Sequence, residues 1–338
     1  MSSASPPARI LIVRTSALGD IVHALPVLTA LRRGFPTARI GWAVDEAFGL
    51  LLSGHRLLDE IFTVPLRRAR RRGSRVAGAR ETLRFLSRLR RFRPDLALDL
   101  MGNHKGALIA FASGAPSRVG ARRRDRREPA SALWINRATP VAATTHAVER
   151  GMALLEAAGL AGAAADFSPE ALRCGEDYAT GEPQIYIHPG AAWGNKRYPP
   201  AQWGRVARLL KERVAVPIRV GSAPGEGHLA DAVVTASDGF ASRLDLPTLP
   251  HLAGALRDAV LVLAGDTGPL HLARALGRPL VGVYGPTDPA LHGPHAAPEA
   301  AIAVRLACSF CHRRMDDAKA CLGAIPPEAI VERALARL

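Results

Sequence analysis

The segment Gly265–Pro289, GDTGPLHLARALGRPLVGVYGPTDP, constrains the fold of this chain more than any other part of its sequence. An apolar run, Ala259–Ala264, leads into a Gly-Asp-Thr-Gly-Pro turn, and a helical pattern then leads to a second apolar run, Leu280–Tyr284. This order is typical of a parallel α/β sheet, whose carboxyl edge binds ligands. The N–H groups that open the helix can hold phosphate oxygens. The segment therefore predicts an anion site, the alternative being an ordinary strand-turn-helix junction capped by Asp and Thr.

A second turn of the same kind lies near the start of the chain. The apolar run Arg9–Val13 is followed by RTSALGD, which ends at Asp20, and then by a helical pattern over Ile21–Arg33. Taken alone, Asp20 is an ordinary helix cap. Together with the first turn, it indicates two sites at strand ends, one in each half of the chain.

The length of 338 residues suits two domains. Strand-like runs alternate with helical patterns in both halves, and a Gly- and Ala-rich passage before Pro183 indicates the linker. The strands are expected at Arg9–Val13, Ile40–Val44, Glu60–Val64 and Leu96–Leu100 in the first half, and at Ile185–His188, Val216–Val220, Gly239–Ser242, Ala259–Ala264 and Leu280–Tyr284 in the second. We therefore expect an α/β chain with a first domain over 1–178, a second over 179–325 and a C-terminal amphipathic helix over 326–338.

The charge indicates anionic partners. Lys and Arg number 45 against 30 Asp and Glu, a formal net charge of +15, and arginine runs lie at 67–72 and 122–127. Nucleic acid, an anionic membrane face and an acidic acceptor compete as partners. Nucleic acid ranks lowest because no aromatic residues are interleaved with the arginines as stacking platforms. Solvated surface charge is the alternative for any single arginine.

Several protein classes are disfavoured. There is no apolar run of about 20 residues and no signal-peptide h-region in MSSASPPAR, and four cysteines form no disulfide framework, so a cytoplasmic protein is expected. Neither a Gly-x-Gly-x-x-Gly fingerprint after the first strand nor a Walker-type Gly-Lys-Ser/Thr occurs, which disfavours a dehydrogenase and an NTPase. A sugar nucleotide matches two strand-end sites best.

Three motifs carry a resemblance to a known family. RTSALGDIVHALPVLTALR, HPGAAWGNKRYPPAQW and the stretch from DTGPLH to GVYGPTDP resemble glycosyltransferase family 9, the ADP-heptose:lipopolysaccharide heptosyltransferases. REPASALWINR and HAVER are most similar to heptosyltransferase I, whereas the cysteine-containing tail is closer to heptosyltransferase II. The resemblance implies the GT-B architecture, in which two Rossmann-like domains face each other across a central cleft and the C-terminal helix folds back on the first domain. It also implies inverting transfer without a metal or other cofactor.

The resemblance assigns roles to individual residues. Asp20 matches the catalytic base. The donor side is matched by Ser16, Lys196, Glu226, Asp266, Thr267, Gly268 and His271. Four of these residues have a structural alternative: a helix cap for Asp20, a solvated loop residue for Lys196, a cap contact for Glu226 and a core histidine for His271.

The acceptor side rests on residues in the basic first half. Lys105, Arg127 and His146 fall in stretches that resemble the family's Kdo-binding side, and Arg67 and Arg68 are placed to meet lipid A phosphates. The expected partners are ADP-heptose, a lipid A/Kdo acceptor and the anionic inner face of the inner membrane, without nucleic acid, and the expected state is a monomer. The remaining alternatives are a different acceptor, either an already heptosylated core or a protein, and a non-catalytic basic module that binds nucleotides or nucleic acid.

A cysteine cluster near the C-terminus leaves two interpretations open. Cys308, Cys311 and Cys321 with His312 provide, by number, the ligands of a zinc site. Adjacent Cys311 and His312 rarely both bind one ion, so packed reduced thiols are the favoured interpretation and no metal is expected.

Overall fold

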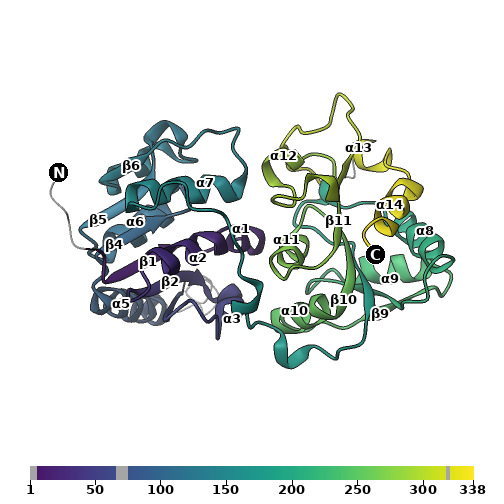
Figure 1. The fold of residues 1–338 in the computed structure, drawn as a ribbon, viewed down its shortest axis with the longest axis horizontal. Helices are drawn as coiled ribbons and strands as arrows, with labels where there is room; N and C mark the ends of the chain where they lie inside the picture. The colour runs from purple at the N-terminus through teal and green to yellow at the C-terminus, as the bar shows by residue number, and fades with distance from the viewer. Residues whose placement is uncertain (1–5, 66–74, 317–319) are drawn as a thin grey trace. The chain divides into compact units, whose positions relative to one another are not determined.

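The computed structural model describes residues 6–65, 75–316 and 320–338, and the chain divides into two compact units, Met1–Cys174 and Gly175–Leu338 (Figure 1). The division falls in the Gly- and Ala-rich passage, a few residues before the expected boundary between 178 and 179.

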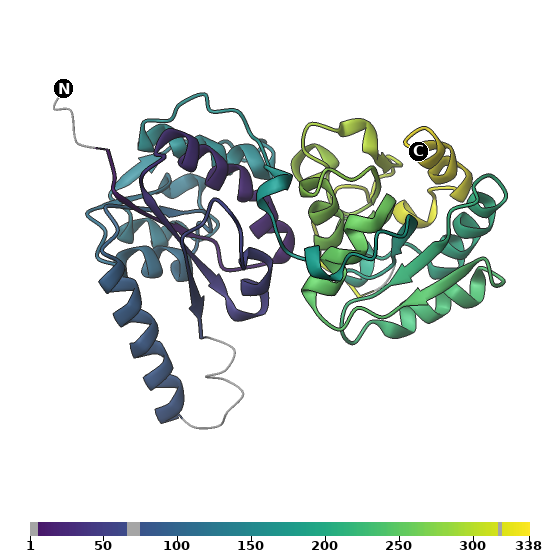
Figure 2. The same cartoon turned by 60° about the horizontal axis from the view of Figure 1, so that its bottom comes forward.

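The first unit is built on a six-stranded parallel sheet in the order β3-β2-β1-β4-β5-β6. Its strands are β1 (Arg9–Val13), β2 (Arg39–Asp45), β3 (Glu60–Val64), β4 (Leu96–Asp99), β5 (Ser117–Ala121) and β6 (Arg137–Thr139). Its α-helices are α1 (Leu18–His23), α2 (Leu25–Gly34), α3 (Gly49–Leu52), α5 (Arg75–Phe92), α6 (His104–Ala112) and α7 (Ala147–Ala153). Figure 2 shows α5 extending beyond the sheet it packs on.

The central strand explains why apolar runs predicted this sheet. Ile10, Leu11, Ile12 and Val13 of β1 are all fully buried. A strand between two parallel neighbours, with helices on both faces, has no solvent side and is apolar throughout. The helix expected over Ile21–Arg33 is instead two helices, which meet at Ala24 because Pro26 suits only the first turn of a helix.

The second unit repeats the plan, with a parallel sheet in the order β12-β11-β10-β7-β8-β9. Its strands are β7 (Gln184–His188), β8 (Ile218–Gly221), β9 (Ala241–Leu244), β10 (Ala259–Gly265), β11 (Leu280–Tyr284) and β12 (Ala301–Ala303). Its α-helices are α8 (Pro200–Lys211), α9 (Gly227–Ala236), α10 (Leu249–Asp258), α11 (Gly268–Ala275), α12 (Pro289–His292), α13 (Ala320–Gly323) and α14 (Pro327–Leu335). Figure 1 shows α8, α9 and α14 on one side of this sheet and α10 and α11 on the other.

Both sheets reverse their strand order at one point. The reversal lies between β1 and β4 in the first unit and between β7 and β10 in the second. Open α/β sheets bind ligands beside the carboxyl ends of the strands at such a point. The turns after β1 and β10, which the sequence singled out, are therefore at the positions where a ligand site is expected.

The C-terminal helix α14 belongs to the second unit. Ile330, Val331 and Ala334 lie in the same core cluster as Trp203 of α8 and Ile187 of β7. The expected folding of residues 326–338 back on the first domain stays a prediction. The apolar face of α14 is already buried against α8, so the core of the second unit accounts for its position.

Candidate functional site

The turn after β10 holds a buried carboxylate with three partners. Lys196 Nζ lies 2.6 Å from Asp266 Oδ2, and the Thr287 hydroxyl donates to the same oxygen at 2.7 Å. His271 Nε2 lies 3.2 Å from Asp266 Oδ1. The side chains of Asp266 and His271 are less than a tenth exposed, whereas Lys196 keeps 16% of its side chain accessible. The structure therefore brings Lys196 from a distant loop to two residues of the predicted turn, Asp266 and His271, and it adds Thr287.

Electrostatics fix the charge of this group. Burial raises the pKa of Asp266, but the hydrogen bond from His271 and the positive charge of Lys196 outweigh burial and hold the pKa well below its usual range. The carboxylate is therefore ionised at neutral pH. It orients Lys196, whose ammonium also lies 4.4 Å from the centroid of the Trp193 ring. A partly accessible cation is thus held in one place at the sheet edge.

The start of α11 adds backbone donors beside this cation. Thr267 is the N-cap residue with extended backbone, and its side chain makes no capping hydrogen bond. Gly268 is the first helical residue, where N–H groups have no acceptor within the helix. These groups and Lys196 together suit a diphosphate, because helix N-termini and ammonium groups both favour negative charge.

The loop that carries Lys196 is fastened to a distant segment of the same unit. Asn195 Nδ2 donates to the Arg313 carbonyl at 2.8 Å, and the Asn195 N–H donates to the Met315 carbonyl at 3.1 Å. The Met315 N–H returns a bond to Asn195 Oδ1 at 3.3 Å. Asn195 is fully buried and supports the loop of Lys196. The sequence analysis did not identify this residue.

Glu226 lies at the start of α9 beside the loop after β7. Its Oε1 accepts from Arg197 Nη2 at 2.8 Å, and it makes no side-chain capping bond. A Cβ at Gly190 would approach Glu226 Oε2 to 2.1 Å, so a larger residue there would displace the carboxylate from this place. The geometry holds a carboxylate near the loop of Lys196, as a site for ribose hydroxyls requires. The sequence analysis did not identify Arg197, although its position directly after Lys196 could have pointed to it.

In the first unit, Asp20 belongs to the turn after β1. It lies within the first turn of α1, where Oδ2 accepts from the Ala17 N–H at 3.1 Å and Oδ1 lies 2.6 Å from Arg14 Nη2. Arg14 also donates to the carbonyl of Leu100, just after β4. The Asp20 side chain is 44% exposed and so stays reachable by a substrate. Ser16 lies in the same loop and is partly buried.

The described residues expected to bind the acceptor lie on three separate segments of the first unit. Lys105 lies in the first turn of α6, and Arg127 is exposed in the segment between β5 and β6. His146 is the N-cap residue of α7, where Nδ1 accepts from the Val148 N–H at 3.2 Å. Arg67 and Arg68 lie outside the described residues.

A buried ion pair organises this region and was not predicted. Asp99, at the end of β4, pairs with Arg126, and neither side chain is exposed. Arg126 Nε also donates to Ser131 Oγ at 2.7 Å. Burial raises the pKa of Asp99, and Arg126 opposes that rise. The pair fixes the residue next to Arg127, so it is suited to positioning the exposed arginine.

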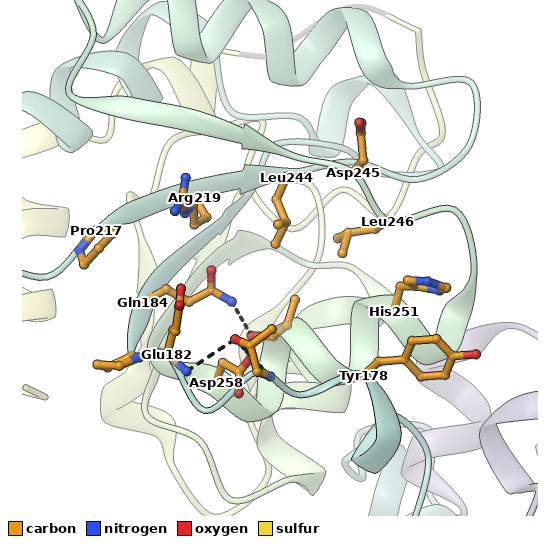
Figure 3. Close-up of a pocket in the computed structure, with 13 residues that line it drawn as sticks. Tyr178, Glu182, Gln184, Pro217, Arg219, Leu244, Asp245, Leu246, His251 and Asp258 are labelled. Atoms are coloured by element: carbon orange, nitrogen blue, oxygen red, sulfur yellow. Dashed lines mark hydrogen bonds between the residues drawn. The ribbon is translucent and has the colours of Figure 1, made fainter.

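The second unit also contains a pocket of about 240 Å³ away from the Asp266 turn (Figure 3). Tyr178, Arg219, Leu246, His251 and Asp258 are among its lining residues. Asp258 is already used, because its carboxylate accepts from the Thr180 and Gly181 N–H groups at 2.8 and 3.0 Å. None of the residues expected to bind the donor lines this pocket.

The cysteine cluster lies partly within the described residues. Cys308 and Cys321 are free thiols that hydrogen-bond to each other, and burial raises the pKa of Cys321. Across residues 6–65, 75–316 and 320–338, no group of three or more His, Cys, Asp or Glu side chains is arranged to hold a metal ion. In the same ranges, no helix has both the length and the apolarity needed to cross a membrane.

The chain resembles known proteins in both sequence and structure. The sequence pattern of glycosyltransferase family 9 (heptosyltransferase) matches residues 82–321. Lipopolysaccharide heptosyltransferase 1 of Pseudomonas aeruginosa is 31% identical over 90% of this chain and 86% of its own length. The protein of the same name from Escherichia coli K12 is 30% identical over 84% of this chain and 90% of its own. The structure of E. coli heptosyltransferase WaaC with ADP superposes with a TM-score of 0.81 at 25% identity, covering 98% of this chain and all of that one.

The two parallel six-stranded sheets and these likenesses define the protein's class, a glycosyltransferase of the α/β GT-B fold. Within that class, the chain belongs to glycosyltransferase family 9.

Proposed function

We propose that this enzyme transfers a heptose from ADP-L-glycero-D-manno-heptose to the Kdo/lipid A inner core during lipopolysaccharide biosynthesis. The observation that carries the proposal is the Lys196–Asp266 pair at the start of α11, in a chain of family 9. The solved relatives contain ADP in one case and ADP-2-deoxy-2-fluoro heptose in another, ligands that this cation and helix start would suit.

The choice of acceptor follows the curated relatives. The relatives from P. aeruginosa and E. coli, 31% and 30% identical, are both named lipopolysaccharide heptosyltransferase 1, whereas the E. coli protein named heptosyltransferase 2 is 28% identical over 83% of this chain. This ranking favours the first heptose of the core over the second.

In the proposed mechanism, Asp20 accepts the proton of the attacking acceptor hydroxyl while the bond between the anomeric carbon and the diphosphate oxygen breaks. Lys196 and the N–H groups at Thr267 and Gly268 stabilise the departing ADP diphosphate. Glu226 holds the ribose hydroxyls, and Ser16 and His271 complete the donor side. Attack from the face opposite the leaving group inverts the anomeric centre, and no metal is assigned a role.

Lys105, Arg127 and His146 are proposed to bind the anionic acceptor. Arg67 and Arg68 keep the same assignment from sequence alone. We also propose that the protein acts as a cytoplasmic monomer in peripheral contact with the inner membrane, which the net charge of +15 supports.

The decisive experiment supplies purified enzyme with ADP-heptose and, separately, with Kdo-lipid A or an already heptosylated core. Mass spectrometry is expected to find one added heptose on Kdo-lipid A. Transfer only to the heptosylated core would replace the proposed acceptor. Transfer to neither acceptor, with ADP still bound, would contradict the proposed function.

A further inference from the structure

Helix α5 has a composition that sheet packing does not require. Its 18 residues include six arginines and a single acidic residue, Glu81. A helix that only covers a sheet needs one apolar face and a mixed polar face. Six positive charges opposed by one negative charge suggest a further role for the outer face.

The orientation of α5 is fixed by its inner face. Phe85, Leu89 and Phe92, spaced at helical intervals, are buried in the core of the first unit. The Phe62 and Phe92 rings meet edge to face, with centroids 5.2 Å apart. Because these side chains anchor the helix, the residues between them in sequence lie on its outer side.

The outer face combines an exposed leucine with arginines. The Leu83 side chain is 66% exposed, and Arg80 and Arg84 on either side of it are also exposed. A shallow hollow of about 420 Å³ follows the same face. Its lining consists of Leu83, Leu86, Ser87, Arg90, Arg91 and Arg93.

Part of this positive charge has no acidic partner among the described residues. Arg88 lies 3.3 Å from Glu60, and Arg90 donates to the carbonyl of Ala112. Within the part of the chain that the structure describes, Arg84 and Arg91 form no ion pair. Their charge is available to an anionic surface.

We infer that the outer face of α5 docks on an anionic lipid bilayer, with Leu83 inserted among the headgroups and the arginines on the lipid phosphates. A basic helix with exposed apolar side chains suits this interface, because arginine stems lie along apolar surface while their guanidinium groups reach phosphate. Nucleic acid fits less well. The aromatic residues of α5, Phe85 and Phe92, are buried and cannot stack on bases.

The inference deepens the proposed function, since a lipid-linked acceptor lies in a bilayer. It can be tested without any transfer reaction. Sedimentation of the full chain with vesicles measures docking, and turnover on a soluble acceptor fragment measures catalysis. Loss of vesicle binding would therefore bear on the docking inference, and loss of turnover on the proposed function.

The test compares Arg84→Gln/Arg91→Gln and Leu83→Ser with wild type on vesicles rich in phosphatidylglycerol and on pure phosphatidylcholine. Each arginine near an anionic surface changes binding by about fivefold, so the double variant is expected to bind phosphatidylglycerol vesicles roughly 30-fold more weakly. Leu83→Ser is expected to lose roughly tenfold, and this loss should persist at high salt. Matched controls in the second unit are Arg213→Gln/Arg305→Gln and Phe240→Ser, all at exposed positions, and they should bind like wild type.

Circular dichroism and turnover on the soluble fragment should be unchanged in every variant, since the altered side chains are exposed. Equal vesicle binding by α5 variants and wild type would overturn the inference. So would equal weakening by the second-unit controls, which would mean that only net charge matters. Binding of the α5 face to RNA or to an acidic protein in preference to the vesicles would also overturn it.

Discussion

Asp266 and Asp20 have the same side chain, but their surroundings suit them to different roles. Asp266 is buried with Lys196, His271 and Thr287, so its carboxylate stays ionised and holds the Lys196 ammonium in place. Asp20 keeps nearly half of its side chain in solvent beside Arg14. A base must reach a substrate proton, which suits the exposed carboxylate and not the enclosed one.

Asp20→Ala is expected to lower kcat by at least about 100-fold while leaving ADP affinity nearly unchanged, because the base acts on the acceptor hydroxyl. Steady-state kinetics and ADP calorimetry measure the two effects. Asp95→Asn is the matched control, since Asp95 is 41% exposed and lies 3.9 Å from Arg9. Near-wild-type turnover in Asp20→Ala would mean that Asp20 only caps the helix and is not the catalytic base.

Lys196→Ala is expected to weaken ADP binding and slow turnover together. A charge-assisted hydrogen bond contributes about 1.5 to 3 kcal/mol, which corresponds to roughly a 10- to 150-fold loss of affinity. Lys211→Ala is the control, because Lys211, at the end of α8, donates to the carbonyl of Ala215 and contacts no donor-side residue among those that the structure describes. Calorimetry that finds unchanged ADP affinity in Lys196→Ala would assign the lysine to pairing with Asp266 only.

At the scale of elements, helix α6 is seated against the buried ion pair. A Cβ at Gly106 would lie 2.2 Å from Asp99 Oδ1 and 2.8 Å from the Met101 side chain. Close backbone approach to the carboxylate is thus what places Lys105 next to the end of β4.

Gly106→Ala is therefore expected to lower the free energy of unfolding by about 1 to 3 kcal/mol, despite the better helix propensity of alanine. Urea titration checks this. Gly323→Ala, where an added Cβ meets nothing within 4 Å, should have little effect. Equal stability of Gly106→Ala and wild type would show that α6 can shift away from Asp99 without cost.

The sequence analysis identified some strands and missed others, and the difference has a physical reason. β1, β10 and β11 are almost continuous apolar runs, because both faces of a central or near-central parallel strand are covered. β5, β6 and β12, by contrast, were missed. They are short strands toward the sheet margins, with sequences such as RAT and AIA that carry no pattern of their own.

Some residues of the candidate site could likewise be predicted from sequence, whereas others could not. Asp266, Thr267, Gly268 and His271 lie within one turn and could be grouped from sequence. The contact of Lys196 with Asp266 spans 70 residues and follows from the pairing of β7 with β10, which apolar patterns do not specify. Asp99 and Arg126 were missed because their burial depends on each other.

At the scale of the whole molecule, burial keeps a histidine neutral in each unit, His55 in the first and His188 in the second. Burial lowers the pKa of His55 to about 4 in the first unit and that of His188 to about 4 in the second. In the unfolded chain both return to 6.5, so below that pH the unfolded state binds more protons than the folded state. Stability should therefore fall as the pH drops from 6.5 towards 4.

Each histidine is expected to contribute up to about 3 kcal/mol to this loss. His55→Asn and His188→Asn should each flatten the dependence of unfolding free energy on pH across this window, as followed by urea titration. His104→Asn, at an exposed position, should leave the slope unchanged. A wild-type slope in both buried-site variants would mean that other groups cause the acid sensitivity.

The bonds of Asn195 to Arg313 and Met315 also have a consequence for the order of synthesis. A nascent chain that has emerged from the ribosome as far as Ala303 contains all the strands of the second sheet that the structure describes. It still lacks the backbone partners that fasten the Lys196 loop. A chain stopped at that point would have the scaffold of the donor side without a fixed cation, so the ability to bind ADP is expected to arrive after the sheet, once Arg313 and Met315 have emerged.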